Sequence, residues 1–152
     1  MATTLTTSTL TVEVTETITI NGVARNSAVT TSIASIAEIH NRIMTVESDA
    51  GGTGIFNVAA TLPSAGTFSR ATFEYCRITN LDDTNFIIFQ FTDESSHYWE
   101  LILEAGKSFM FGDVSSFDDQ ANIDNFSAST MTKLIAKADT ADCDIEIYIA
   151  ST

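Results

Sequence analysis

Strict alternation of apolar and polar residues recurs in four separate segments, and this period of two constrains the fold more than any other feature. The first segment runs from Leu10 to Ile20 with Thr or Glu between the apolar residues, and only Glu16 interrupts the apolar row. Successive side chains of a strand point to opposite faces, so each row predicts a half-buried strand. The rows together predict a core made of these residues: Val12, Val14, Ile18, Phe89, Phe91, Trp99, Leu101, Leu103, Ile145, Ile147 and Ile149.

Turn signals separate the alternating segments at short intervals. Asn21-Gly22 is a strong tight-turn dipeptide, and an Asn/Asp cluster follows at residues 80–85. A further strand is expected at residues 39–47, with a possible short helical turn before it. About eight to ten short strands, spaced roughly 8–12 residues apart, predict an all-β, antiparallel β-sandwich or barrel. A β-sandwich of jelly-roll topology is preferred, and an immunoglobulin-like topology is the alternative.

The length and composition fit one folded domain. A chain of 152 residues has the size of a single domain, and we expect residues 1–9 to form an N-terminal arm and residues 10–152 one β-sandwich domain. Hydrophobic residues make up 44% and charged residues 18%, which excludes a disordered chain. No apolar run approaches the ~20 residues that a membrane-spanning helix needs.

The net charge of −13 narrows the possible partners. Such an acidic chain repels phosphate backbones and anionic lipid, so neither nucleic acid nor membrane is an expected partner. A high negative charge keeps copies of the chain soluble and apart before assembly. The alternative, functional explanations of the charge are docking onto a basic surface and binding of divalent cations.

No residue pattern predicts a catalytic site, a cofactor or a metal centre. His40 and His97 lie outside any metal-ligand motif, no residue pattern selects a nucleophile, and no phosphate-binding glycine loop is present. The carboxylate clusters at residues 82–83, 113–124 and 139–144 lack the spacing of a calcium-binding EF-hand. We therefore expect no enzyme activity. Cys76 and Cys143 lie in apolar stretches of a chain without a signal-peptide pattern, so we expect reduced, unjoined thiols and synthesis in the cytoplasm.

Several segments carry a family resemblance. A strand ending in RITNLDDTNF, an AGKSF turn and the C-terminal ADTADCDIEIYIAST resemble small virion proteins of tailed bacteriophages, especially those of aquatic hosts. The N-terminal LTVEVTETITING, with SIAEI and RIMTV, is similar to the same group. The resemblance spans most of the chain and contains no catalytic motif.

The resemblance implies a structural role on a virion that is assembled in the host cytoplasm. It implies a capsid decoration or cement protein that binds and stabilises the head shell. The alternatives are a tail or head–tail accessory protein, or a carbohydrate- or receptor-binding module. The expected partners are the major capsid protein or other virion proteins, and further copies of the chain. An enzyme is the third class, which a pocket with a histidine beside a carboxylate would favour.

The long acidic loop at residues 113–130 is the predicted contact region. Structureless segments of this length are uncommon in compact domains and are usually functional or disordered. Its apolar residues could anchor a contact, and its carboxylates could form the polar rim around that contact. The alternative is that the apolar residues fold back onto their own sandwich. The predicted interface residues are Phe117, Asp118, Asp119, Ile123, Asp124 and Phe126.

Overall fold

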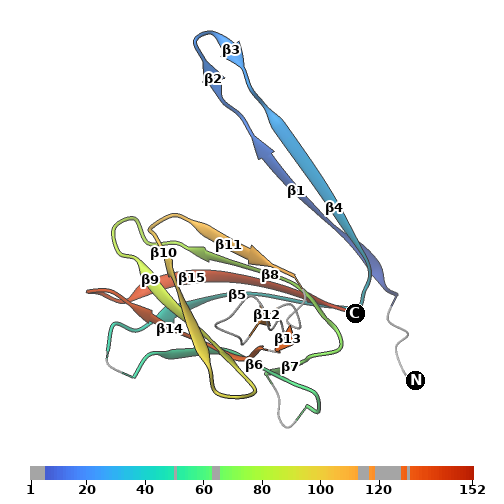
Figure 1. Ribbon diagram of the computed structural model, residues 1–152, viewed down its shortest axis with the longest axis vertical. Coiled ribbons are helices and arrows are strands. Elements are labelled where there is room, and N and C mark those ends of the chain that lie inside the picture. The colour runs from blue at the N-terminus through green and yellow to red at the C-terminus, as the bar shows by residue number, and fades with distance from the viewer. Residues whose placement is uncertain (1–5, 50, 63–65, 113–116, 119–127, 130) are drawn as a thin grey trace.

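Two packed β-sheets form the body of the protein (Figure 1). The computed structural model describes residues 6–49, 51–62, 66–112, 117–118, 128–129 and 131–152. One sheet has five strands in the order β10-β9-β14-β6-β7, and the other has four in the order β11-β8-β15-β5. The predicted all-β sandwich is confirmed, while the preference for a jelly roll over an immunoglobulin-like topology stays a prediction.

The strands of the two sheets have the following bounds. The five-stranded sheet contains β6 (Thr53–Ala59), β7 (Thr67–Ser69), β9 (Ile87–Asp93), β10 (Tyr98–Leu103) and β14 (Met131–Ala138). The four-stranded sheet contains β5 (Glu38–Val46), β8 (Phe73–Asn80), β11 (Ser108–Phe111) and β15 (Cys143–Ser151). Neighbouring strands pair antiparallel, except that β6 and β7 pair parallel.

The core lies between the two sheets and is filled by alternate side chains. Of the predicted core, the following residues are buried: Phe89, Phe91, Leu103, Ile145, Ile147 and Ile149. Leu101 is partly buried and packs against this cluster. Trp99 is 37% exposed on the edge strand β10, where its ring stacks on Phe91 with a centroid distance of 4.0 Å. In β9, β10 and β15 the alternation therefore located core strands correctly, and Trp99 is more exposed than expected because β10 is an edge strand.

The first alternating segment is the main correction. Val14 and Ile18 are exposed and Val12 is only half-buried, because they belong to a β-hairpin outside the sandwich. Strand β1 (Ser8–Glu16) pairs with β4 (Ser27–Ile36), and β2 (Thr19–Ile20) pairs with β3 (Val23–Ala24) near the tip. We call residues 8–36 the hairpin arm. Figure 1 shows it leaving the sandwich near the C-terminus and pointing away.

Local backbone geometry sets both ends of the hairpin arm. At the tip, Asn21 and Gly22 have φ values of 51° and 77°, and two successive positive φ angles are what a type I′ hairpin turn requires. At the root, β4 continues to Ile36, so the possible helical turn before residue 39 is wrong. Ser35 there has φ 64°, which kinks the chain before it enters β5. The described residues contain no helix that is long and apolar enough to cross a membrane.

We predict that replacing a buried isoleucine lowers the free energy of unfolding more than replacing an exposed one. Ile147→Ala removes a fully buried side chain from the centre of β15 and should lower the free energy of unfolding by about 2–5 kcal/mol. Ile102→Ala, at a half-exposed position on β10, should cost less than about 1 kcal/mol. Urea unfolding followed by tryptophan fluorescence measures both, and equal losses would contradict the assigned core.

Candidate interaction surface

The hairpin arm presents an apolar face that its own chain leaves largely uncovered. Cross-strand neighbours share a face, and the register pairs Leu10 with Ile33 and Val14 with Val29. In β1 only Leu10 and Val12 are half-buried, so this apolar face turns toward the sandwich at the root of the arm. Beyond the root, the exposed apolar residues are Val14, Ile18, Ile20, Val23 and Val29, with 37% to 59% of each accessible to solvent.

The solvent-facing side of β11-β8-β15-β5, called here the outer sheet face, lies beneath the root of the arm. Strands β8 and β15 bring Tyr75, Arg77 and Tyr148 to this face, because Tyr148 pairs with Arg77 across the ladder. The two tyrosine rings meet edge to face with centroids 6.2 Å apart. On the edge strand β5, Ile39 and Ile43 share this face and are 54% and 64% exposed.

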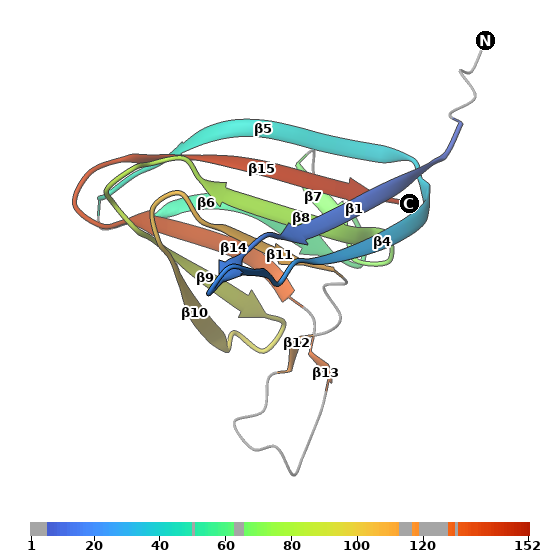
Figure 2. The same cartoon turned by 90° about the horizontal axis from the view of Figure 1, so that it is seen from above.

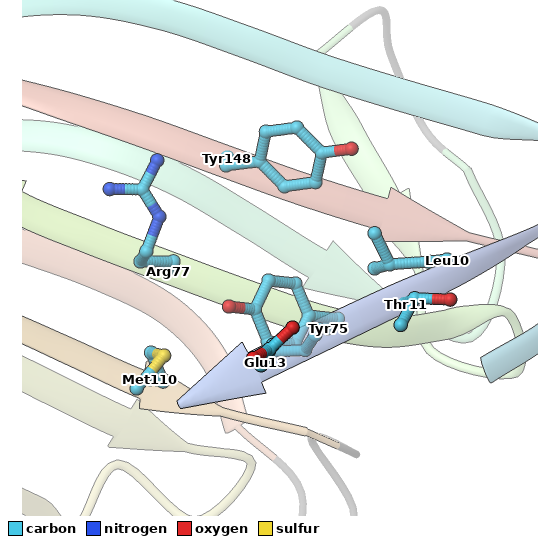
Figure 3. A pocket seen from close by; sticks show the side chains of 8 residues that line it. Leu10, Thr11, Glu13, Tyr75, Arg77, Met110 and Tyr148 are labelled. Carbon is cyan, nitrogen blue, oxygen red and sulfur yellow. The ribbon is translucent and has the colours of Figure 1, made fainter. Parts of the chain in front are cut away.

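A pocket of about 270 Å³ lies where the arm meets the outer sheet face (Figure 3). Figure 2 shows the arm projecting over the four-stranded sheet from this point. Beyond this point the arm runs away from the sheet (Figure 1). The lining residues are Leu10, Thr11, Val12, Glu13, Tyr75, Arg77, Met110 and Tyr148.

The outer sheet face contains the ion pair of Arg77 with Glu146 and the exposed carboxylate of Asp144, which accepts the Thr45 hydroxyl. Arg77 Nη2 donates to Glu146 Oε2 at 2.6 Å, and Arg77 Nη1 donates to the Thr79 hydroxyl at 2.6 Å. Burial raises the pKa of Tyr75 and outweighs the opposing effect of Arg77, so this phenol is neutral at physiological pH. The surface is thus a mixture of aromatic, aliphatic and polar groups. Such a surface is suited to packing against another molecule.

The root of the arm is fixed to the sandwich. Ile36 is buried, and the Ala37 N–H donates to the Ser151 carbonyl at 2.9 Å. The last residues of the chain therefore hold the point where the arm leaves. This anchoring limits how far the arm can fold back onto its own sheet.

The RITNLDDTNF segment builds a turn. The buried Asn80 side chain donates to the carbonyls of Asn85 and Leu103, and its Oδ1 accepts the Asp82 N–H. Thr140, from the ADTA segment, donates its hydroxyl to Asn85 Oδ1 at 2.8 Å. Two of the segments that carry the family resemblance therefore contact each other, and their polar groups are used to close one end of the sandwich.

The predicted loop contacts are only partly within the described residues. Phe117 and Asp118 form the short strand β12 (Phe117–Asp118), which pairs with β13 (Ala128–Ser129). Asp119, Ile123, Asp124 and Phe126 lie outside the described residues. Their role as an interface stays a prediction. The arm and the outer sheet face were not predicted as a site, because alternation shows that a face is apolar without showing what covers it.

The two histidines lie in separate places with separate partners. His40 Nε2 is 2.9 Å from Glu38, and its ring meets Phe68 edge to face. His97 Nδ1 is 3.1 Å from Asp93. His40 and Glu38 line a pocket of about 150 Å³, whose lining also includes the hydroxyl residues Thr67, Ser69, Thr72 and Ser151. A histidine beside a carboxylate in a pocket, the feature that would favour an enzyme, therefore occurs at this place in the fold. No group of three or more metal-ligating side chains occurs among the residues described.

Both cysteines are free and buried. Cys76 pairs with Ile149 across the ladder, six residues along β15 from Cys143, which places the two cysteines about 20 Å apart at ~3.3 Å per residue. A disulfide cannot span that distance. Burial raises the pKa of Cys143 to about 11, with Asp82 adding to the effect, and burial also raises the pKa of Cys76. Both thiols therefore stay protonated and poorly nucleophilic.

Comparison with known proteins identifies no relative. No protein-family model, curated protein or solved structure matches the chain.

We predict that two turn carboxylates make stability fall in acid. Asp82 accepts the N–H groups of Asn85 and Thr84, and Asp142 accepts the N–H and hydroxyl of Ser48. These hydrogen bonds lower the pKa of both carboxyl groups. A lowered folded-state pKa gives a contribution that is fully present above the ordinary Asp value of about 3.9 and is lost as the pH falls through the folded value.

The D82N/D142N variant tests this linkage. Denaturant unfolding between neutral pH and about pH 3 should show a smaller acid-induced loss of stability for the variant than for the wild type. Asp83→Asn serves as the control in the same turn, where the carboxylate accepts only the side-chain hydroxyl of Thr84 among the contacts described. An unchanged acid profile for D82N/D142N would contradict the assignment.

Proposed function

We propose that this protein is a structural protein of a tailed-bacteriophage virion, and that it decorates the capsid by binding and stabilising the head shell. The observation that carries the structural role is the hairpin arm, whose apolar face stays exposed beyond its root among the residues that the structure describes. In this proposal the protein acts by binding, without catalysis or a cofactor.

The physical argument for an assembly role starts from the weakness of the isolated arm. A two-stranded hairpin is at best marginally stable in water without a third strand or a packed face. The hairpin arm exposes five β-branched residues, and an exposed apolar surface of this kind is typical of a protein–protein contact. A chain that kept this arm permanently in solvent would gain nothing from its apolar residues, so the arm is best explained as a docking element.

The choice of a virion shell as the site of docking comes from the resemblance to small virion proteins and from the charge. The body of the protein is strongly acidic, with a net charge of −13 for the whole chain. An acidic body favours a basic partner surface and disfavours contact with packaged nucleic acid. The major capsid protein or another virion protein is the proposed partner, and a tail or head–tail accessory position is the alternative within the same class.

One observation favours a second candidate, a carbohydrate- or receptor-binding module on the virion. Tyr75 and Tyr148 lie side by side on the outer sheet face and border the pocket with Arg77 (Figure 3). Aromatic rings beside a polar group are typical of sugar-binding surfaces. The arm root covers part of this face, which favours protein packing there. A glycan array probed with the wild type and with Tyr148→Ala separates the two candidates, because only the second predicts a signal that the substitution removes.

We predict that the full-length protein binds phage head shells. Shells assembled from the capsid protein encoded with this chain, and lacking it, should co-sediment with the added protein and resist heating to a higher temperature. If the acidic body meets a basic surface, the affinity should fall as salt rises from about 50 mM to 500 mM. Tailed-phage tails purified from the same particles serve as the comparison. Binding to tails alone would support a position on the tail instead of the capsid. Binding to neither shells nor tails would contradict the proposal.

We predict a separate effect for the acidic loop. A variant with Phe117, Ile123 and Phe126 all replaced by Ala should fold but lose about tenfold or more in affinity for shells, since buried aromatic anchors dominate interface energies. Ile102→Ala, at an exposed position on β10, is the matched control and should bind as the wild type does. Unchanged binding by a folded triple variant would place the loop outside the interface.

A further inference from the structure

Two apolar surfaces of one chain remain open, and one chain cannot bring them together. The first is the distal part of the arm, beyond Val12, which diverges from the sandwich (Figure 1). The second is the β5 side of the outer sheet face, where Ile39 and Ile43 are exposed. From its root at Ile36 and Ala37 the arm runs away from the sandwich, and in this arrangement its distal apolar residues lie away from its own β5 (Figure 1).

We propose that the distal hairpin arm of one copy packs its apolar face onto the outer sheet face of a second copy of this chain. Val14 and Val29 of the donating copy lie over Ile39 and Ile43 of the accepting copy. Closed symmetry lets every copy both donate and accept an arm, which covers all the open apolar rows at once. The inference goes beyond shell binding and does not depend on it.

The root of the arm shows that the two surfaces suit each other. Within one chain, Leu10 and Val12 are half-buried and border one pocket with Tyr75, Met110 and Tyr148 of the outer sheet face. Val14 and Val29 continue the same face of the same ribbon, and Ile39 and Ile43 continue the same face of the same sheet. The proposed contact therefore brings together the continuations of two surfaces that already approach each other at the root of the arm.

The distribution of charge favours a second copy over an arbitrary contact between two such acidic chains. The arm contains two carboxylates, Glu13 and Glu16, and one cation, Arg25, so it carries −1 of the total −13 and leaves −12 on the remaining residues. On the accepting face, Arg77 neutralises Glu146, and the exposed Asp144 accepts the Thr45 hydroxyl. Two acidic bodies repel each other, but a nearly neutral arm can reach the sheet face while the bodies stay apart.

The edge of the accepting sheet directs the contact to its face. Strand β5 is an edge strand, and its inward row contains His40 and Arg42, which pair with Ile149 and Ile147. The Arg42 guanidinium donates to the Ile55 carbonyl of the opposite sheet. Inward-pointing charged side chains on an edge strand disfavour addition of another strand there. Packing of the arm across the outer face avoids this obstacle.

Two matched sets of variants test the proposal by sedimentation velocity over a concentration series. The arm variant V14T/V29T keeps shape and strand propensity but makes the donated face polar, and the sheet variant I39T/I43T does the same to the accepting face. Each should weaken self-association at least about tenfold. The control T15S/A28S changes the cross-strand pair on the opposite face of the arm and should associate as the wild type does. Circular dichroism and thermal unfolding at low concentration verify that each variant folds.

Mixing the variants identifies the partner surface. An equimolar mixture of V14T/V29T and I39T/I43T joins an intact arm to an intact sheet face, so it should associate more tightly than either variant alone. A wild-type chain that stays monomeric at its highest soluble concentration overturns the inference. A sheet variant that associates normally also overturns it, because the arm would then pack elsewhere. Shell binding by a monomeric chain would refute this inference alone, and self-association without shell binding would refute the proposed function alone.

Discussion

The central position of β15 is the constraint on which the rest of the structure depends. This last strand pairs with β5 on one side and β8 on the other, so it joins residues near 40, near 77 and near 147 in one sheet. Its alternate residues Ile145, Ile147 and Ile149 are almost fully buried against the other sheet. Its final residues also hold the root of the hairpin arm through the bond from Ala37 to Ser151. Core, sheet and arm therefore depend on the same nine residues at the end of the chain.

The sequence was informative wherever one face of a strand is buried in the core of the same chain. Alternation at residues 143–151 and at Phe89 and Phe91 indicated buried rows, and the structure confirms them. Asn21-Gly22 indicated the tip turn for a physical reason, because both residues need positive φ. These features are local or are set by period alone, so no knowledge of the partner strand was needed.

The same reasoning failed for the hairpin arm because period does not specify the covering surface. Val14 and Ile18 alternate as regularly as the core isoleucines, yet they lie outside the sandwich. What decides the difference is the kink at Ser35 and the anchored root at Ile36, which are set by contacts with distant residues. The tyrosine pair of the outer sheet face was missed for a similar reason, since Tyr75 and Tyr148 are 73 positions apart and only the β8–β15 register brings them together.

In the proposed self-association, the arm and the edge strand β5 have opposite effects on contacts between copies. Open strand edges promote uncontrolled pairing, and His40 and Arg42 on the inward row of β5 disfavour such pairing. An exposed apolar face promotes association too, but face packing requires complementary shapes and gives a defined geometry. A chain with a charged edge and an apolar arm thus suppresses the first kind of contact and retains the second. The net charge of −13 adds repulsion between the bodies, and in the proposed arrangement the nearly neutral arm bridges them.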